Sequence, residues 1–162
     1  MMQITEPVTT LTDYALGAAN LYFALATYNG MHPGNRVTGL LLLLGYLAEA
    51  ISALAGGTFH GFATYLERDW LQRLWNLTMV FSGATVAFLA GGIHAASVRR
   101  EHGLWIVAGV ATAVAGLCIQ ATGFRARQPF NHNDVFHIII IAAMYLFFVG
   151  ARNLRDRGYS PR

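Results

Sequence analysis

The densest group of chemically useful side chains lies in residues 130–137, which read FNHNDVFH. Two histidines, one aspartate and two asparagines occur here directly before an apolar run at 138–149. If a helix begins at the second asparagine, Asp134 and His137 are three residues apart and share the face of its first turn. Carboxylate oxygens and imidazole nitrogens on one face can ligate a metal ion or move a proton. His132 lies five positions before His137, so it can join them only by folding back from outside the helix.

Two more acidic residues fall in segments that are otherwise apolar. Glu49 interrupts the run at 37–57, where an ionisable group is costly enough to be a candidate for function. The alternative is a protonated or hydrogen-bonded carboxyl that ties helices together. His60 follows Glu49 by eleven residues, about three helical turns, so both line one face. Asp13 is most simply a residue near a helix start that Thr12 caps, and otherwise a proton-handling group.

The composition is that of a membrane protein. Of 162 residues, 55% are hydrophobic and only 12% are charged, which is too apolar for an ordinary soluble domain of this length. The apolar runs are long enough to cross a bilayer as helices. The sequence therefore predicts one all-α transmembrane domain spanning 1–162, a bundle of five helices at about 12–28, 37–57, 74–96, 104–122 and 133–151.

The basic residues exclude some functions. All eleven are arginine, so the chain lacks the lysine amine that a retinal or pyridoxal Schiff base requires. They lie in short connections and near the C-terminus, without an aromatic-interleaved basic patch. This pattern favours contact with membrane lipids and predicts no binding of nucleic acid.

Five crossings place the two termini on opposite sides of the membrane. Four arginines then fall on the N-terminal side, namely Arg68, Arg73, Arg125 and Arg127. Seven fall on the other side, namely Arg36, Arg99, Arg100, Arg152, Arg155, Arg157 and Arg162. The excess of positive charge predicts a cytoplasmic C-terminus and an outward N-terminus in the inner (plasma) membrane. The same count brings several polar residues to one depth, namely His60, His132, His137, Asp13, Asn76 and Asp134.

Three histidines and a carboxylate at one depth suit a catalytic zinc site. Such a site uses three protein ligands and leaves the fourth position to water. The bound water ionises near neutral pH and can attack a carbonyl carbon. The chemistry that this arrangement would serve is hydrolysis.

Two short segments resemble the alkaline ceramidase and progestin/adipoQ receptor (CREST) superfamily of membrane hydrolases. They are Thr58-Phe59-His60 and Asn133-Asp134-Val135-Phe136-His137. In that family a histidine of the second helix and an HxxxH pair at the start of the last helix bind zinc, and a serine and an aspartate assist the water. The resemblance implies that His60 is the first zinc ligand and His137 the last, with Asn76 near the place of the family's aspartate.

The third ligand stays open, because this chain has asparagine where the HxxxH pair begins. His132 or Asp134 would have to take that position. The chain also has five predicted helices where the family has seven. Its five-helix outline resembles small bacterial membrane proteins as well, and that likeness implies no function.

The leading hypothesis is thus an integral membrane protein that acts as a zinc-dependent hydrolase on an amide or ester of a lipid. Its zinc ligands would be His60, His132 and His137. Asp134 would be a ligand or would orient one, Asn76 would position the water, and Glu49 or Asp13 would handle protons. One alternative is a non-enzymatic accessory subunit of a membrane complex, in which these groups cap helices and join the bundle. Another is a haem protein with His60 and His137 as axial ligands.

Overall fold

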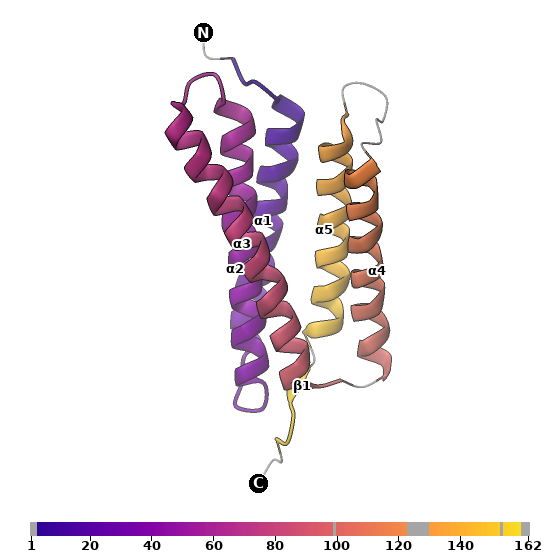
Figure 1. Cartoon of the computed structure of the whole chain (residues 1–162). Coiled ribbons are helices and arrows are strands. Elements are labelled where there is room, and N and C mark those ends of the chain that lie inside the picture. Colours follow the sequence, from indigo (N-terminus) through magenta and orange to yellow (C-terminus); the bar gives the residue numbers. More distant parts are fainter. Residues whose placement is uncertain (1–2, 99, 123–129, 153, 160–162) are drawn as a thin grey trace.

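The described part of the chain folds into five long helices and one very small sheet (Figure 1). The computed structural model describes residues 3–98, 100–122, 130–152 and 154–159. Its elements are α1 (Pro7–Asn29), α2 (Arg36–Phe62), α3 (Arg68–Ala95), β1 (Ala96–Ser97), α4 (Arg100–Thr122), α5 (His132–Ala151) and β2 (Arg155–Asp156). Four helices, α2 to α5, are long and apolar enough to cross a membrane. The prediction of an all-helical chain with five long helices is confirmed.

The first helix begins earlier than predicted. It starts at Pro7 instead of near residue 12, and proline suits this first helical position because its fixed φ is helical and no N–H is needed there. Thr12 therefore does not cap the helix, and Asp13 does not lie in its first turn. Both helix-capping predictions for these residues are wrong.

Three other helices are also longer than predicted. α2 runs to Phe62, so His60 belongs to its last turn. α3 begins at Arg68, six residues before the predicted start, and α4 begins at Arg100. These added turns carry charged residues that a search for apolar runs does not count as helix. The arginines at 99, 125, 127 and 162, which entered the topology count, lie outside the described residues.

The helices pack in two groups that meet along α1 and α5. α1, α2 and α3 pack in sequence, and α4 packs against α5 (Figure 1). The α4–α5 contact is close because two glycines face the partner's backbone. A Cβ atom at Gly109 would lie 3.0 Å from the carbonyl oxygen of Ala143, and one at Gly150 would lie 3.0 Å from that of His102. Side chains larger than hydrogen would separate these two helices.

The apolar core is concentrated toward the C-terminal end of the bundle. The ring of Phe23 on α1 stacks on that of Phe148 on α5, with centroids 5.0 Å apart. Tyr46 of α2 packs beside both rings and is fully buried. Leu154, which follows α5, is also buried in this cluster. The tail after α5 is therefore part of the core.

The tail closes the C-terminal end of the bundle. β2 pairs with β1 in antiparallel register, Ala96 opposite Asp156. The Asp156 carboxylate accepts hydrogen bonds from the backbone N–H groups of Val37 (3.0 Å) and Thr38 (2.8 Å) at the start of α2. Partial burial would raise the pKa of Asp156, but hydrogen bonds from Thr38 and Val37 outweigh it and hold this pKa below its ordinary value.

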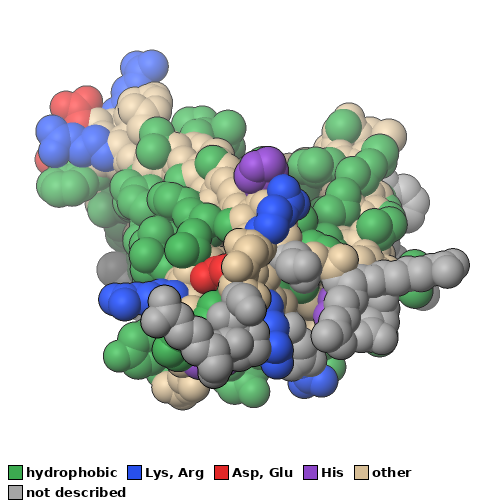
Figure 2. All heavy atoms as spheres, turned by 90° about the horizontal axis from the view of Figure 1, so that it is seen from below, with side chains coloured by type: hydrophobic (Ala, Val, Ile, Leu, Met, Phe, Trp, Pro, Cys, Tyr) green, Lys and Arg blue, Asp and Glu red, His purple; other side chains and the backbone are tan. Residues whose placement is uncertain are grey.

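The C-terminal end also carries basic side chains. Figure 2, which views the molecule from this end, shows them scattered among hydrophobic side chains. The exposed arginines of this end include Arg36, Arg152, Arg155 and Arg157. The first and last described segments lie at opposite ends of the bundle, as expected for five successive helices that alternate in direction (Figure 1).

Candidate functional site

The polar residues at the start of α5 cap this helix. The Asn131 side chain accepts from the N–H groups of Asn133 (2.7 Å) and Asp134 (3.2 Å). The Asp134 carboxylate in turn accepts from the Asn131 N–H at 2.7 Å. This reciprocal pair is a capping box, which satisfies backbone donors that a helix start would otherwise leave unpaired. It fixes where α5 begins and which way Asp134 and His137 face.

Asp134 also joins α5 to α1. Its side chain is fully buried, and its second oxygen accepts a hydrogen bond from the Thr9 hydroxyl at 2.7 Å. The Asn131 amide donates to the same hydroxyl oxygen at 3.1 Å. Both carboxyl oxygens of Asp134 are thus bonded within the protein. Its observed contacts are those of a positioning residue.

His137 lies one turn further along α5 and is held by two neighbours on α1. Its Nε2 atom is 3.1 Å from Oδ1 of Asp13, and its Nδ1 atom is 3.1 Å from the Thr12 hydroxyl. Asp13 is 4% exposed, and its other oxygen, Oδ2, has no hydrogen-bond partner among the described residues. The ring is therefore fixed in orientation, beside a carboxyl oxygen that is free to accept another donor.

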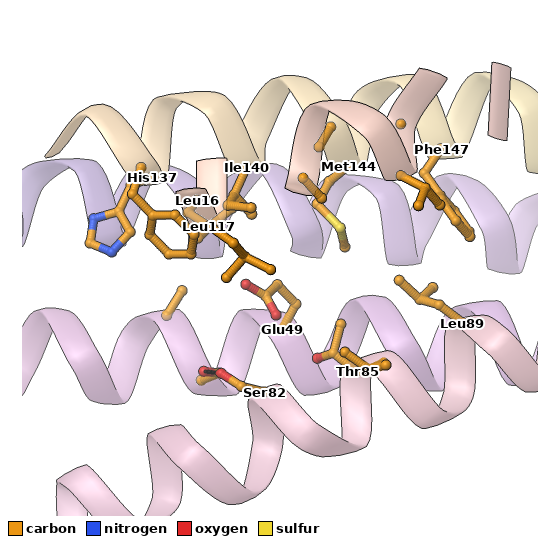
Figure 3. Close-up of a pocket in the computed structure, with 18 of the residues that line it drawn as sticks. Leu16, Glu49, Ser82, Thr85, Leu89, Leu117, His137, Ile140, Met144 and Phe147 are labelled. Carbon is orange, nitrogen blue, oxygen red and sulfur yellow. Dashed lines mark hydrogen bonds between the residues drawn. The ribbon is translucent and has the colours of Figure 1, made fainter. Parts of the chain in front are cut away.

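Glu49 approaches the same region from α2. Its carboxyl group lies beside the Thr85 hydroxyl of α3 and within electrostatic reach of Asp13. Nearby, the hydroxyls of Ser52 and Ser82 are 2.8 Å apart and link α2 to α3. Figure 3 shows Glu49 pointing into the space between these helices and the α4–α5 pair.

These groups border a cavity of about 410 Å³ between the two groups of helices (Figure 3). Asp13, Glu49 and His137 are its ionisable lining residues among those described, and most of the remaining wall is aliphatic or aromatic. The volume is within the range of about 300–1,000 Å³ that small-molecule sites occupy.

The cavity opens at the side of the bundle between α3 and α4. Val86 on α3 and Val114 and Leu117 on α4 line it, yet they are 69%, 53% and 56% exposed. α3 makes no extensive contact with α4 or α5, which leaves this side open. A molecule could therefore enter without passing through either end of the bundle.

The structure brings only some of the predicted site residues together. Asp13, Glu49 and His137 meet at the cavity, with Asp134 behind them. His60 lies in the last turn of α2, close enough to His137 for the two rings to interact electrostatically, and its Nδ1 atom is 3.4 Å from a Glu6 carboxyl oxygen without forming a well-aligned hydrogen bond.

Two predicted residues stand apart from the cavity. Asn76 is exposed and accepts a hydrogen bond from Gln72 on the same helix at 2.8 Å, so it is not placed to position water there. His132 is the first residue of α5 and does not line the cavity. The three histidines proposed as ligands thus share one end of the bundle, and His137 is the one of them that lines this cavity.

Sequence reasoning missed Thr9 and Thr12, the partners of Asp134 and His137. A signal for Thr9 was present. Thr9, Asp13, Leu16 and Asn20 recur every three or four residues and are all buried, which marks one inward face of α1. Thr12 had been assigned to the helix cap, so its contact with α5 was not considered.

Side chains predicted to bind zinc have other polar partners among the described residues. Among residues 3–98, 100–122, 130–152 and 154–159, no group of three or more His, Cys, Asp or Glu side chains is placed to hold a metal ion. His137 has a polar protein partner on each ring nitrogen, and Asp134 has one on each oxygen. The zinc centre and the haem pair stay predictions from the sequence.

The fold and the site define an all-helical protein with four helices able to cross a membrane and a side-opening cavity that carries acid–base groups. The chain belongs to a family of unknown function (DUF6962), which it matches over residues 8–100 and 78–156. Comparisons with curated proteins and with solved structures gave no match. The resemblance to the ceramidase superfamily therefore rests on the two short motifs alone.

Proposed function

We propose that this protein is an integral membrane protein that takes a lipid-like molecule into the side-opening cavity and handles a proton at its polar wall. Four apolar helices support insertion into a bilayer. α1 would be the fifth crossing, because its polar residues Thr9, Asp13 and Asn20 are buried against the other helices. The arginine distribution favours a cytoplasmic C-terminus in the inner (plasma) membrane.

The observation that carries this proposal is the combination of a side opening with ionisable groups inside. In a bilayer the opening between α3 and α4 would face hydrocarbon chains, since exposed valines and leucines surround it. An apolar chain could enter from the lipid phase and bring its polar group to Asp13, Glu49 and His137. Such intramembrane ionisable groups mark functional sites by default.

Hydrolysis of a lipid amide or ester is the reaction class that these groups would serve. A water would take the place of the Thr12 hydroxyl at Nδ1 of His137 and give its proton to that atom as its oxygen attacks the carbonyl carbon, while Asp13 at Nε2 orients the ring and stabilises its charged form. Glu49, on a different helix, would supply a second group to protonate the leaving atom. This scheme assigns Asp134 a positioning role through α5, and it uses no metal ion.

The test is turnover by the protein reconstituted in phosphatidylcholine vesicles, measured on a panel of long-chain esters and amides. We expect His137→Gln to lower the rate by about 100-fold or more, because general-base catalysis contributes at least that much. His94→Gln is the matched control, since His94 is exposed near the other end of α3. Equal rates for His137→Gln and the parent protein would overturn the acid–base assignment.

The same preparation tests the zinc prediction. Elemental analysis of purified protein measures metal bound per chain, and a chelator tests whether turnover depends on it. Stoichiometric zinc that disappears in His60→Ala and His137→Ala would favour the zinc-dependent hydrolase over the metal-free scheme.

A non-enzymatic subunit of a membrane complex is the second candidate. It is favoured by the apolar faces of α3 and α4, because only 17% of each membrane-length window is buried inside the bundle. Such faces contact either lipid or neighbouring proteins. A chain that shows no turnover and migrates with a constant partner after mild solubilisation would support this alternative.

A further inference from the structure

The shape of the cavity suggests an elongated occupant. Its lining on α3 extends from Thr78 to Ile93, about 22 Å along the helix, and its lining on α5 from Phe136 to Phe147, about 16 Å. A volume of about 410 Å³ spread over such lengths gives a narrow space. One extended hydrocarbon chain fits this shape better than a broad ring system.

The polar wall of the cavity offers a buried acceptor that lacks a donor. Oδ2 of Asp13 is buried without a partner among the described residues. Gly56 faces this carboxyl group and has no side chain to cover it, since a Cβ atom there would lie 3.6 Å from both carboxyl oxygens. Glu49 has the Thr85 hydroxyl beside it. A buried acceptor without a donor costs free energy, so a donor from a bound molecule would be stabilising.

Positive charge to match these carboxyl groups is scarce. None of the described lining residues is arginine, and the chain contains no lysine. A carboxylate or phosphate head would therefore meet two acidic groups, and the one described basic residue of the wall, His137, is already paired with Asp13. An ammonium head would bring a positive charge and three N–H donors to the same place.

We propose that the cavity binds a single-chain amphiphile whose head is a primary amine, held by Asp13 and Glu49. This inference rests on the proposed function and gives its ligand a chemical class. The apolar wall holds the chain, and the amine donates hydrogen bonds to Oδ2 of Asp13 and to the Glu49 carboxyl group. The same wall selects against an acidic head by charge repulsion.

The experiment uses a long-chain primary amine with a photoreactive diazirine in its chain, and the carboxylic acid and alcohol of the same length. Each probe is added to the full chain in phosphatidylcholine nanodiscs, and labelled peptides are identified by mass spectrometry. We expect saturable labelling of the cavity segments of α3, α4 and α5 by the amine, with an apparent affinity about tenfold higher than that of the acid.

Two variants locate the head group. Glu49→Gln and Asp13→Asn keep the shape of the side chains and should each weaken amine labelling by about tenfold or more, because a charge-assisted hydrogen bond is lost. Glu67→Gln is the control, since Glu67 is exposed at the start of α3. All samples are first shown to be monodisperse and equally resistant to heat.

The outcomes separate the two proposals. Equal saturable labelling by amine and acid, or amine labelling unchanged in Glu49→Gln and Asp13→Asn, would overturn the amine assignment and leave cavity binding intact. An absence of saturable labelling by all three probes would overturn the binding function itself.

Discussion

The two ends of the bundle are buried by different means. At the N-terminal end, α1 meets α5 through the hydrogen bond from Thr9 to Asp134 and the 3.1 Å contact between Asp13 and His137. At the C-terminal end, the same two helices meet through the stacked rings of Phe23 and Phe148. Directional bonds fix polar atoms in place beside an open cavity, whereas apolar packing excludes water and leaves few polar atoms. One helix pair is thus joined by polar contacts at one end and by apolar packing at the other.

The helix starts at the two ends are also stabilised by different means. α5 is capped from within its own sequence, by Asn131 and Asp134 three residues apart. α2 instead donates hydrogen bonds from its first backbone N–H groups to Asp156, which lies 119 residues from Val37 along the chain. The first cap forms as soon as the local segment folds, but the second forms only after α5 and the tail have returned to α2.

The largest expected effect is at the polar end. Asp134→Ala removes the capping box and leaves Thr9 without its buried acceptor, so we expect the free energy of unfolding to fall by about 2–4 kcal/mol. The measurement is unfolding in mixed micelles by titration with a denaturing detergent. Asp69→Ala is the control, because Asp69 is exposed in the first turn of α3 and should cost under about 1 kcal/mol. Equal losses in the two variants would mean that the α1–α5 network adds nothing beyond a surface charge.

A somewhat smaller effect tests the packed end. Gly150→Ala places a methyl group 3.0 Å from backbone atoms of α4, so we expect a loss of about 1–3 kcal/mol from separating α4 and α5. Gly83→Ala should be neutral or stabilising by up to about 1 kcal/mol, because its Cβ would meet no described atom within 4 Å. The same detergent titration measures both variants. If Gly150→Ala behaves as Gly83→Ala does, the close α4–α5 contact is not needed for stability.

The smallest effect concerns the Asp156 carboxylate, which accepts two hydrogen bonds at the packed end. Asp156→Asn should cost about 0.3–1 kcal/mol at neutral pH, since a carboxylate near the start of α2 is lost. The pKa of Asp156 is lowered in the folded chain, so its contribution is fully present above the ordinary value of 3.8 and is lost as the pH falls through the folded pKa. Parent and variant should therefore converge in stability at acidic pH. A difference that persists in acid would exclude the carboxylate charge as its cause.

The sequence alone determined the helical class, the number of long helices and the end of the bundle at which His60, His132 and His137 lie. These features follow from long apolar runs and from counting alternating helices, which need no knowledge of packing. Helix starts were placed up to six residues late, because proline and charged residues at helix ends look like loop in a search for apolar segments.

Only the tertiary structure decided which polar groups meet. The partners Thr9 and Asp134, and likewise Thr12 and His137, are 125 residues apart in the chain. Whether such groups touch depends on how α1 and α5 are rotated about their axes and how far they slide, and both are set by packing along their whole length. A rotation of one helix by a single residue position, about 100°, would turn these side chains away from each other. The sequence could therefore name Asp13, Glu49 and His137 as candidates, but packing alone placed them around one cavity and left Asn76 outside it.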